Sequence, residues 1–175
     1  AVLHGMMADA AWRIGDTERA LAAVARACEL DPSYAWAFAA RIRWLTQLQR
    51  ADEAIAIAGE QRRQYPNWPV AYELHAEALE LAGRHTERVD ALRAGVALSP
   101  RLGSMRHRLV DALIELKQFD DARTAIEEGL QRLGDDPQLR LRQARLDRTA
   151  GRIAAAREAL RAMLETHPEI GRAHV

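Results

Sequence analysis

Residues 28–32 read Cys-Glu-Leu-Asp-Pro, and the proline that ends this phrase returns at a fixed interval along the chain. Pro32, Pro66 and Pro100 are each 34 residues apart, and the next two places in step are Gly134 and Pro168. Proline lacks a backbone N–H and crowds the preceding helical turn, and glycine also ends helices, so each of these residues marks a helix end. The chain therefore divides into segments 1–34, 35–68, 69–102, 103–136 and 137–170 without an insertion.

The five segments share small and apolar residues at fixed places. The eighth place holds Ala8, Ile42, Ala76, Val110 and Ala144, and the twentieth holds Ala20, Ala54, Arg88, Ala122 and Ala156. Apolar residues three and four apart predict two helices in each segment, and the fifteenth-place glycines Gly83 and Gly151 predict a chain reversal between them. First helices are expected near 3–14, 36–48, 70–82, 104–116 and 138–150. Second helices are expected near 17–30, 51–64, 86–98, 119–133 and 153–166.

These columns resemble the tetratricopeptide repeat, a 34-residue helix–turn–helix unit. The resemblance covers residues 1–170 and continues into residues 171–175, which are expected to begin a further helix. It implies an all-α fold, a right-handed superhelical α-solenoid of stacked antiparallel helix pairs. One pair cannot bury its apolar face alone, so neighbouring pairs complete the core. We expect a single array over residues 1–175, as a fragment of a longer chain.

Six residues depart from the repeat pattern: Arg41, Arg88, Arg106, Arg140, Gln143 and Asp147. Arg88 replaces a packing alanine, and Arg106 stands where a large apolar residue is preferred. Arginine can lay its methylenes on an apolar surface and keep its guanidinium in water, which is the expectation for both. Asp147 occupies an interior column, where an unpaired carboxylate is costly, so it is expected to have an arginine neighbour or to lie at an exposed end.

The composition excludes several classes of function. Lys+Arg and Asp+Glu number 25 each, so no chain-wide basic field is available for nucleic acid. No apolar run approaches the roughly 18–20 residues that cross a bilayer. The single Cys28 is expected to be a small buried hydrophobe, and the six histidines lack metal-binding spacing. No catalytic or nucleotide-binding motif occurs, so neither catalysis, a metal nor a cofactor is expected within these residues.

The resemblance also implies a concave groove, lined by the first helices, in which a partner peptide binds. It assigns the second, fifth, sixth, ninth, twelfth and thirteenth places of each segment to this groove. The Lys/Asn/Arg clamp of the class that binds chaperone tails is absent, because Gly5 and Asp9 stand at its first positions. Apolar anchoring is expected from Trp12 and Trp36 in the first two segments. An acidic row (Glu73, Glu77 and Glu80) and a basic row (Arg142, Arg145 and Arg148) are expected to orient the partner. The alternative is that these charged rows are only solvated surface. The expected partner-binding residues are Trp12, Arg13, Trp36, Arg43, Glu73, Glu77, Glu80, His107, Arg108, Arg142, Arg145 and Arg148.

The sequence thus predicts a non-catalytic scaffold, from a bacterial protein, that binds a protein or peptide partner. One alternative is a regulatory or substrate-docking domain of a larger enzyme such as a transferase. A second is the periplasmic arm of an envelope or exopolysaccharide export machine. The N-terminal residues do not resemble a signal peptide, which favours the cytoplasm unless a leader has been removed. No oligomeric state follows from the sequence.

Overall fold

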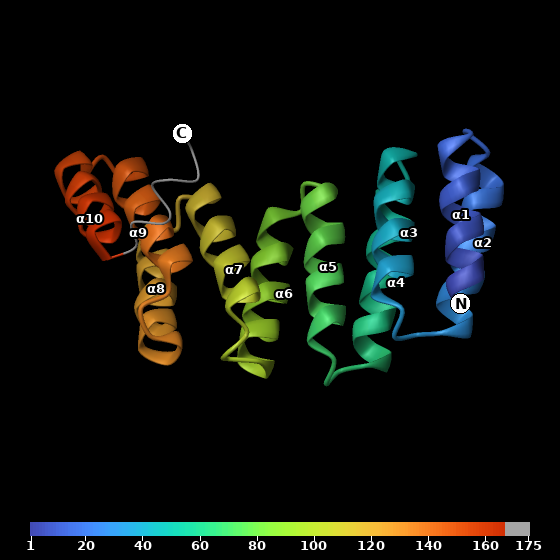
Figure 1. Ribbon diagram of the computed structural model, residues 1–175, viewed down its shortest axis with the longest axis horizontal. Coiled ribbons are helices and arrows are strands. Elements are labelled where there is room, and N and C mark those ends of the chain that lie inside the picture. Colours follow the sequence, from blue (N-terminus) through green and yellow to red (C-terminus); the bar gives the residue numbers. More distant parts are fainter. Residues whose placement is uncertain (167–175) are drawn as a thin grey trace. The chain divides into compact units, whose positions relative to one another are not determined.

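The computed structural model describes residues 1–166, and within them it contains ten α-helices and no strand (Figure 1). The expected all-α class is therefore confirmed. The helices are α1 (Val2–Arg13), α2 (Thr17–Leu30), α3 (Ala35–Gln47), α4 (Ala51–Gln64), α5 (Pro69–Leu81), α6 (His85–Leu98), α7 (Gly103–Glu115), α8 (Phe119–Leu133), α9 (Pro137–Thr149) and α10 (Ile153–Thr166). The helix expected to begin in residues 171–175 lies outside the described residues.

The helix bounds follow the 34-residue frame closely. The second helices have the expected bounds, except that α6 begins at His85, one residue early. Each first helix begins and ends one residue earlier than expected. Pro69 and Pro137 explain the early start in two segments, because proline is pre-organised for the first helical position, where its missing N–H is not needed.

The fifteenth place of every segment takes a left-handed backbone conformation. Gly83 has φ 72° and Gly151 has φ 80°, which confirms the role expected of these glycines. Gln49 and Lys117 stand at the same place with φ 61° and 58°. The turn is therefore kept without glycine in two segments, at the cost of the Cβ strain that this conformation gives an L-residue.

The chain forms two compact units, Ala1–Ala91 (unit 1) and Leu92–Val175 (unit 2). In unit 1 the core includes Ala8, Ala20, Ile42 and Ala54, all fully buried at the eighth and twentieth places. In unit 2 the equivalent Val110 and Ala122 are also fully buried. Helices pack closely where these side chains are small, which is the structural reason for the repeated columns.

The expectation that Arg88 and Arg106 keep their guanidinium groups in water is wrong. Arg88 is 3% exposed and contacts Glu80 at 3.2 Å, and Arg106 is 2% exposed. Arg106 Nη1 donates to the Ala125 carbonyl at 3.2 Å and lies 3.4 Å from a Glu128 carboxylate oxygen. The Arg106 side chain fits because residue 129 is glycine: a Cβ there would lie 2.5 Å from Arg106 Cδ. The expectation for Asp147 is confirmed, since Arg152 Nε donates to it at 2.9 Å.

Candidate functional site

An aromatic cluster lies on the first helices of unit 1. The rings of Trp12 in α1 and Trp44 in α3 stack with centroids 4.8 Å apart and planes 10° apart. Trp36 meets Trp44 edge to face at 6.3 Å, and Tyr34 stacks on Trp36 at 5.7 Å. Offset stacking and edge-to-face contacts are the favoured arrangements of aromatic rings. The cluster therefore holds Trp36 in a defined orientation on the surface.

The aromatic cluster can pack closely against α1 because Gly5 has no side chain. A Cβ at Gly5 would lie 3.0 Å from the Tyr34 ring and 3.1 Å from the Trp36 ring. Trp44 is 7% exposed and supports the cluster from beneath, whereas Trp36 is 41% exposed. Met6, at the neighbouring groove place on α1, is 64% exposed. Unit 1 thus presents an apolar surface with one pre-oriented indole, a typical composition for an interface anchor.

Sequence reasoning found Trp12 and Trp36 but missed Tyr34 and Trp44. Trp44 falls at the tenth place of its segment, outside the places that the family resemblance assigns to the groove. The available signal was its separation of eight residues from Trp36, about two helical turns, which puts both on neighbouring parts of the same helix. Tyr34 precedes α3 and carried no signal that we can identify.

The expected charged residues of unit 1 are engaged within the chain. Arg43 Nε in α3 donates to Glu77 Oε1 in α5 at 2.7 Å, and Glu80 contacts the buried Arg88. Glu73 also has an interaction within the chain. Arg13 pairs with Asp9 at 2.9 Å on the surface of α1. The acidic row is therefore partly neutralised by neighbouring arginines.

The expected residues of unit 2 form a second ion network. Asp111 in α7 accepts from Arg142 Nη2 at 2.7 Å and from Arg145 Nη1 at 3.0 Å, both in α9. Arg142 Nε also donates to the His107 carbonyl at 3.1 Å. His107 Nε2 lies 3.1 Å from Asp136 Oδ2. Arg108 has an interaction within the chain as well.

The last member of the basic row differs from the other two. Arg148 is exposed, and no interaction of its side chain is found among residues 1–166. The structure thus joins Arg142 and Arg145 to one carboxylate and leaves Arg148 outside that network.

The ninth place of the repeat supplies one ion pair in each network. Arg43 and Glu77 occupy it in consecutive segments of unit 1, and Asp111 and Arg145 occupy it in consecutive segments of unit 2. Opposite charges 34 residues apart thus bridge adjacent first helices. Such half-exposed pairs contribute modestly to stability, and their pairing reduces the net charge offered to a partner.

Each unit also has a groove whose floor is a first helix and whose walls are the second helices on either side. In unit 1 the groove lies between α2, α3 and α4, and in unit 2 between the C-terminal half of α6, α7 and α8. Most lining residues hold equivalent places two repeats apart, among them Pro32 and Pro100, Phe38 and Arg106, and Glu60 and Glu128. Sequence reasoning did not find these grooves, because they depend on which side chains fill the space between second helices.

Two titratable groups of unit 1 are shifted by burial. Desolvation raises the pKa of the Cys28 thiol to about 11, against a smaller opposing effect of Arg41. The expectation of a buried hydrophobe at Cys28 is confirmed, and its thiolate is disfavoured at neutral pH. Desolvation also lowers the pKa of His75 to about 4, assisted by the nearby charge of Arg62.

No helix within residues 1–166 is long and apolar enough to cross a membrane. Nor do three or more His, Cys, Asp or Glu side chains in this range gather in a way that could hold a metal ion.

Comparisons with known proteins agree with this architecture. Two tetratricopeptide repeat family models match residues 1–34 and 103–146. A human protein, tetratricopeptide repeat protein 28, is 27% identical over 106 residues, which are 61% of this chain and 4% of the human protein. The chain thus spans a small fraction of the length of this relative.

Solved structures show the same fold at low identity. A MamA structure has a TM-score of 0.69 at 15% identity and covers 99% of this chain and 95% of its own. TTC0263, a TPR protein of Thermus thermophilus, has a TM-score of 0.63 at 19% identity, covering 94% and 90%. YrrB, a TPR protein with an unusual peptide-binding site, has a TM-score of 0.62 at 17% identity, covering 94% and 85%.

Residues 1–34 and 103–146 thus match the tetratricopeptide repeat, and the chain has the helical fold of tetratricopeptide solenoids. This family and fold support a role in protein interaction.

Proposed function

We propose that the chain is a non-catalytic scaffold that binds a peptide segment of a partner protein on the first-helix surface of unit 1, with Trp36 as the anchor. The observation that supports this most is the aromatic cluster itself. Trp36 is 41% exposed, yet Tyr34 and Trp44 fix its ring from two sides. An aromatic side chain that is already ordered loses little conformational freedom when a partner covers it, and such residues dominate binding hot spots.

The partner is a protein or peptide segment rather than a nucleic acid or a membrane. A peptide-binding site is a property of YrrB, which shares the fold. Apolar surface around Trp36 and Met6 suits an extended segment with a large apolar side chain. The expected charged rows contribute less than the sequence suggests, because Glu77, Arg142 and Arg145 have partners within the chain. We expect the remaining charges to affect the association rate more than the affinity.

The proposal is tested with a phage-displayed library of random twelve-residue peptides, selected on the wild-type chain. Kinetics of the enriched peptides are then measured by biolayer interferometry against the wild type and Trp36→Ala. Some enriched peptides should carry a large apolar side chain, and we call these the apolar class. We expect Trp36→Ala to lower the affinity for the apolar class by about 30-fold or more, mainly through faster dissociation, since hot-spot truncation costs about 2 kcal/mol or more.

The matched control is Trp68→Ala. Trp68 lies in the same unit, precedes α5 and packs edge to face on Tyr65, which is not a member of the aromatic cluster. The Trp68→Ala substitution should leave the affinity for the apolar class of peptides unchanged. If no peptide is enriched, or if the two variants weaken binding equally, the first-helix surface of unit 1 is not the binding site.

A further inference from the structure

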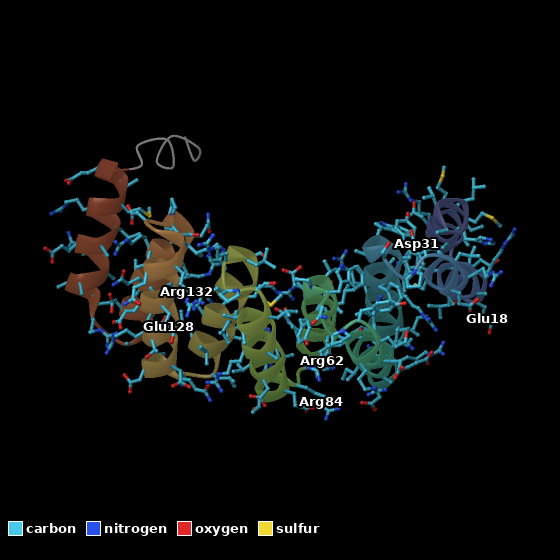
Figure 2. The ribbon with its side chains drawn as sticks, turned by 90° about the horizontal axis from the view of Figure 1, so that it is seen from below. Glu18, Asp31, Arg62, Arg84, Glu128 and Arg132 are labelled. Carbon is cyan, nitrogen blue, oxygen red and sulfur yellow. The ribbon has the colours of Figure 1, made fainter. Side chains whose placement is uncertain are left out.

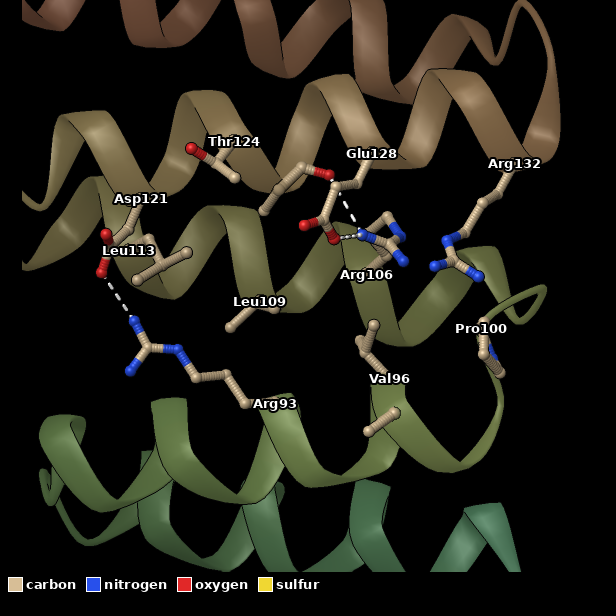
Figure 3. A pocket seen from close by; sticks show the side chains of 12 residues that line it. Arg93, Val96, Pro100, Arg106, Leu109, Leu113, Asp121, Thr124, Glu128 and Arg132 are labelled. Carbon is tan, nitrogen blue, oxygen red and sulfur yellow. Dashed lines mark hydrogen bonds and ion pairs between the residues drawn. The ribbon is translucent and has the colours of Figure 1, made fainter.

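The groove of unit 2 on α6, α7 and α8 is a cavity of about 430 Å³. Its apolar part is formed by Val96 of α6 and by Leu109 and Leu113 of α7 (Figure 3). A second cavity of about 760 Å³ adjoins it and shares Pro100 and Arg132 with it. The two together make a continuous groove of the size that proteins use for small ligands and short peptide segments.

This groove is formed by different places of the repeat from those of the aromatic cluster. Its floor is made by Arg106, Leu109 and Leu113, at the fourth, seventh and eleventh places of the segment. None of these places belongs to the concave groove that the family resemblance implies. Unit 2 also contains no tryptophan. The proposal for this groove therefore goes beyond the proposed function and does not depend on it.

The charges of the groove are unbalanced. Two arginines have carboxylate partners inside it: Arg93 contacts Asp121 at 2.6 Å, and Arg106 lies 3.4 Å from Glu128. Arg101 and Arg132 also line the groove, are exposed, and have no side-chain partner among the described residues. Arg132 extends from α8 toward Pro100, beside the Arg106 guanidinium (Figure 3). Figure 2 shows Arg132 and Glu128 together on the same part of α8.

Arg106 adds a buried cation behind the exposed ones. It is 2% exposed, and its Nε atom has no hydrogen-bond partner among the described residues. Its contact with Glu128 is long and involves a carboxylate whose side chain is 55% exposed. A buried guanidinium that is only partly compensated raises the positive potential of the cavity, because the low-dielectric surroundings screen it weakly.

The equivalent groove of unit 1 provides the contrast. Its lining contains two arginines, Arg41 and Arg63, and two carboxylates, Glu29 and Glu60. At the places of Arg106 and Arg132 it has Phe38 and Gln64. The cationic excess is thus a property of the unit 2 groove and not of the repeat.

We propose that the unit 2 groove binds an acidic peptide segment in which a large apolar side chain is followed by Asp or Glu. The apolar side chain would lie on Leu109 and Val96, and the carboxylates would meet Arg132 and Arg101 at the open end. Arginine binds carboxylates through two parallel hydrogen bonds, which orient the segment as well as bind it. Charge complementarity selects an acidic occupant.

The test uses the same random twelve-residue peptide library, selected in parallel on three forms of the full chain. The first is the wild type, the second is Arg101→Gln with Arg132→Gln, and the third is Arg123→Gln with Arg157→Gln. The third form is the matched control, because Arg123 and Arg157 are exposed arginines of unit 2 outside the groove lining. It removes the same charge from the same unit, so it separates local recognition from the general electrostatic field.

We expect peptides with an apolar residue followed by acids to be enriched on the wild type and the control but not on the groove variant. A synthetic copy of an enriched peptide should lose at least about tenfold in affinity on the groove variant, and a copy with Asn and Gln in place of its acids should lose as much. Trp36→Ala should leave this class of peptides unaffected. The proposal is wrong if acidic peptides are not enriched, if both double variants lose them equally, or if the amide copy binds as well as the acidic one.

Discussion

Unit 1 and unit 2 use the same places of one 34-residue frame for different chemistry. The first helices of unit 1 present a tryptophan cluster, and all four tryptophans of the chain lie in residues 1–91. The first helices of unit 2 instead present Asp111 bridged to two arginines. The grooves between the second helices also differ, because arginines outnumber carboxylates in the lining of the unit 2 groove and equal them in that of unit 1. The repeat therefore fixes where helices lie and leaves the surface chemistry of each unit free.

The contrast extends into the core through three equivalent pairs of residues. Phe38, Gln61 and Ala71 of unit 1 correspond to Arg106, Gly129 and Leu139 of unit 2. Gln61 is 2% exposed and donates to the Pro32 carbonyl at 3.0 Å, whereas Gly129 leaves room for Arg106 and Leu139. The smaller residue at position 129 is thus offset by a larger side chain at position 139, so the total side-chain volume of the three places changes little. Close packing makes such exchanges viable only in combination.

The largest effect is expected from filling the space at Gly129. A Cβ there would lie 2.5 Å from both Arg106 Cδ and Leu139 Cδ1. We expect Gly129→Ala to lower the free energy of unfolding by about 2–3 kcal/mol through overpacking. Urea unfolding followed by circular dichroism measures this effect in the whole chain. Tryptophan fluorescence reports unit 1 alone and should change less.

Gly59→Ala is the control for that prediction. Gly59 lies within α4, and its added Cβ would meet only His75, at an ordinary distance of 3.6 Å. Alanine is favoured over glycine inside a helix, so we expect a gain of about 0.5–1 kcal/mol. Equal effects of the two substitutions would show that Arg106 and Leu139 do not crowd residue 129.

A smaller effect, confined to unit 1, is expected from His75. Its folded-state pKa of about 4 is below its unfolded value, so the unfolded chain binds the proton first. Its contribution to stability is therefore fully present above about pH 6.5 and is lost as the pH falls toward 4. The full shift corresponds to about 3 kcal/mol, and we expect about 1–2 kcal/mol because the ring is only half-buried.

The measurement is urea unfolding followed by tryptophan fluorescence between pH 7 and 4. His75→Gln should flatten the decline relative to the wild type. His85→Gln, which removes an exposed histidine of the same unit, should not. Parallel pH profiles for His75→Gln and the wild type would contradict the burial argument.

The smallest effect is a gain of stability at the turns between paired helices. Lys117 and Gln49 adopt the left-handed conformation that glycine takes at the same place in the other segments. We expect Lys117→Gly to raise the free energy of unfolding by about 0.5–1 kcal/mol, since relief of the Cβ strain exceeds the added chain entropy. Gly83→Ala, at the equivalent turn of unit 1, should lower it by a similar amount. Thermal melts of the two variants check the pair, and a loss at Lys117→Gly would contradict it.

The sequence predicted the helices well because their positions depend on local signals that recur. Proline or glycine near the segment ends, together with the regular 34-residue frame, bounded each helix to within one residue, and the apolar residues of the eighth place indicated the core. Arg106 shows where this reasoning fails. Its burial depends on Gly129, 23 positions away, and no local pattern joins the two. The ion pairs of the charged rows were missed for the same reason, because Glu77 and Asp111 have partners 34 residues away in the sequence.

The central claim is that Trp36 anchors a partner peptide on unit 1. Its most direct test is fluorine NMR of the chain labelled with 5-fluorotryptophan. The label gives one resonance for each of Trp12, Trp36, Trp44 and Trp68, and replacing each tryptophan in turn assigns them. On titration with a peptide of the apolar class selected above, we predict the largest shift at Trp36, smaller shifts at Trp12 and Trp44, and none at Trp68. A titration in which the peptide binds while Trp36 stays unchanged would contradict the claim.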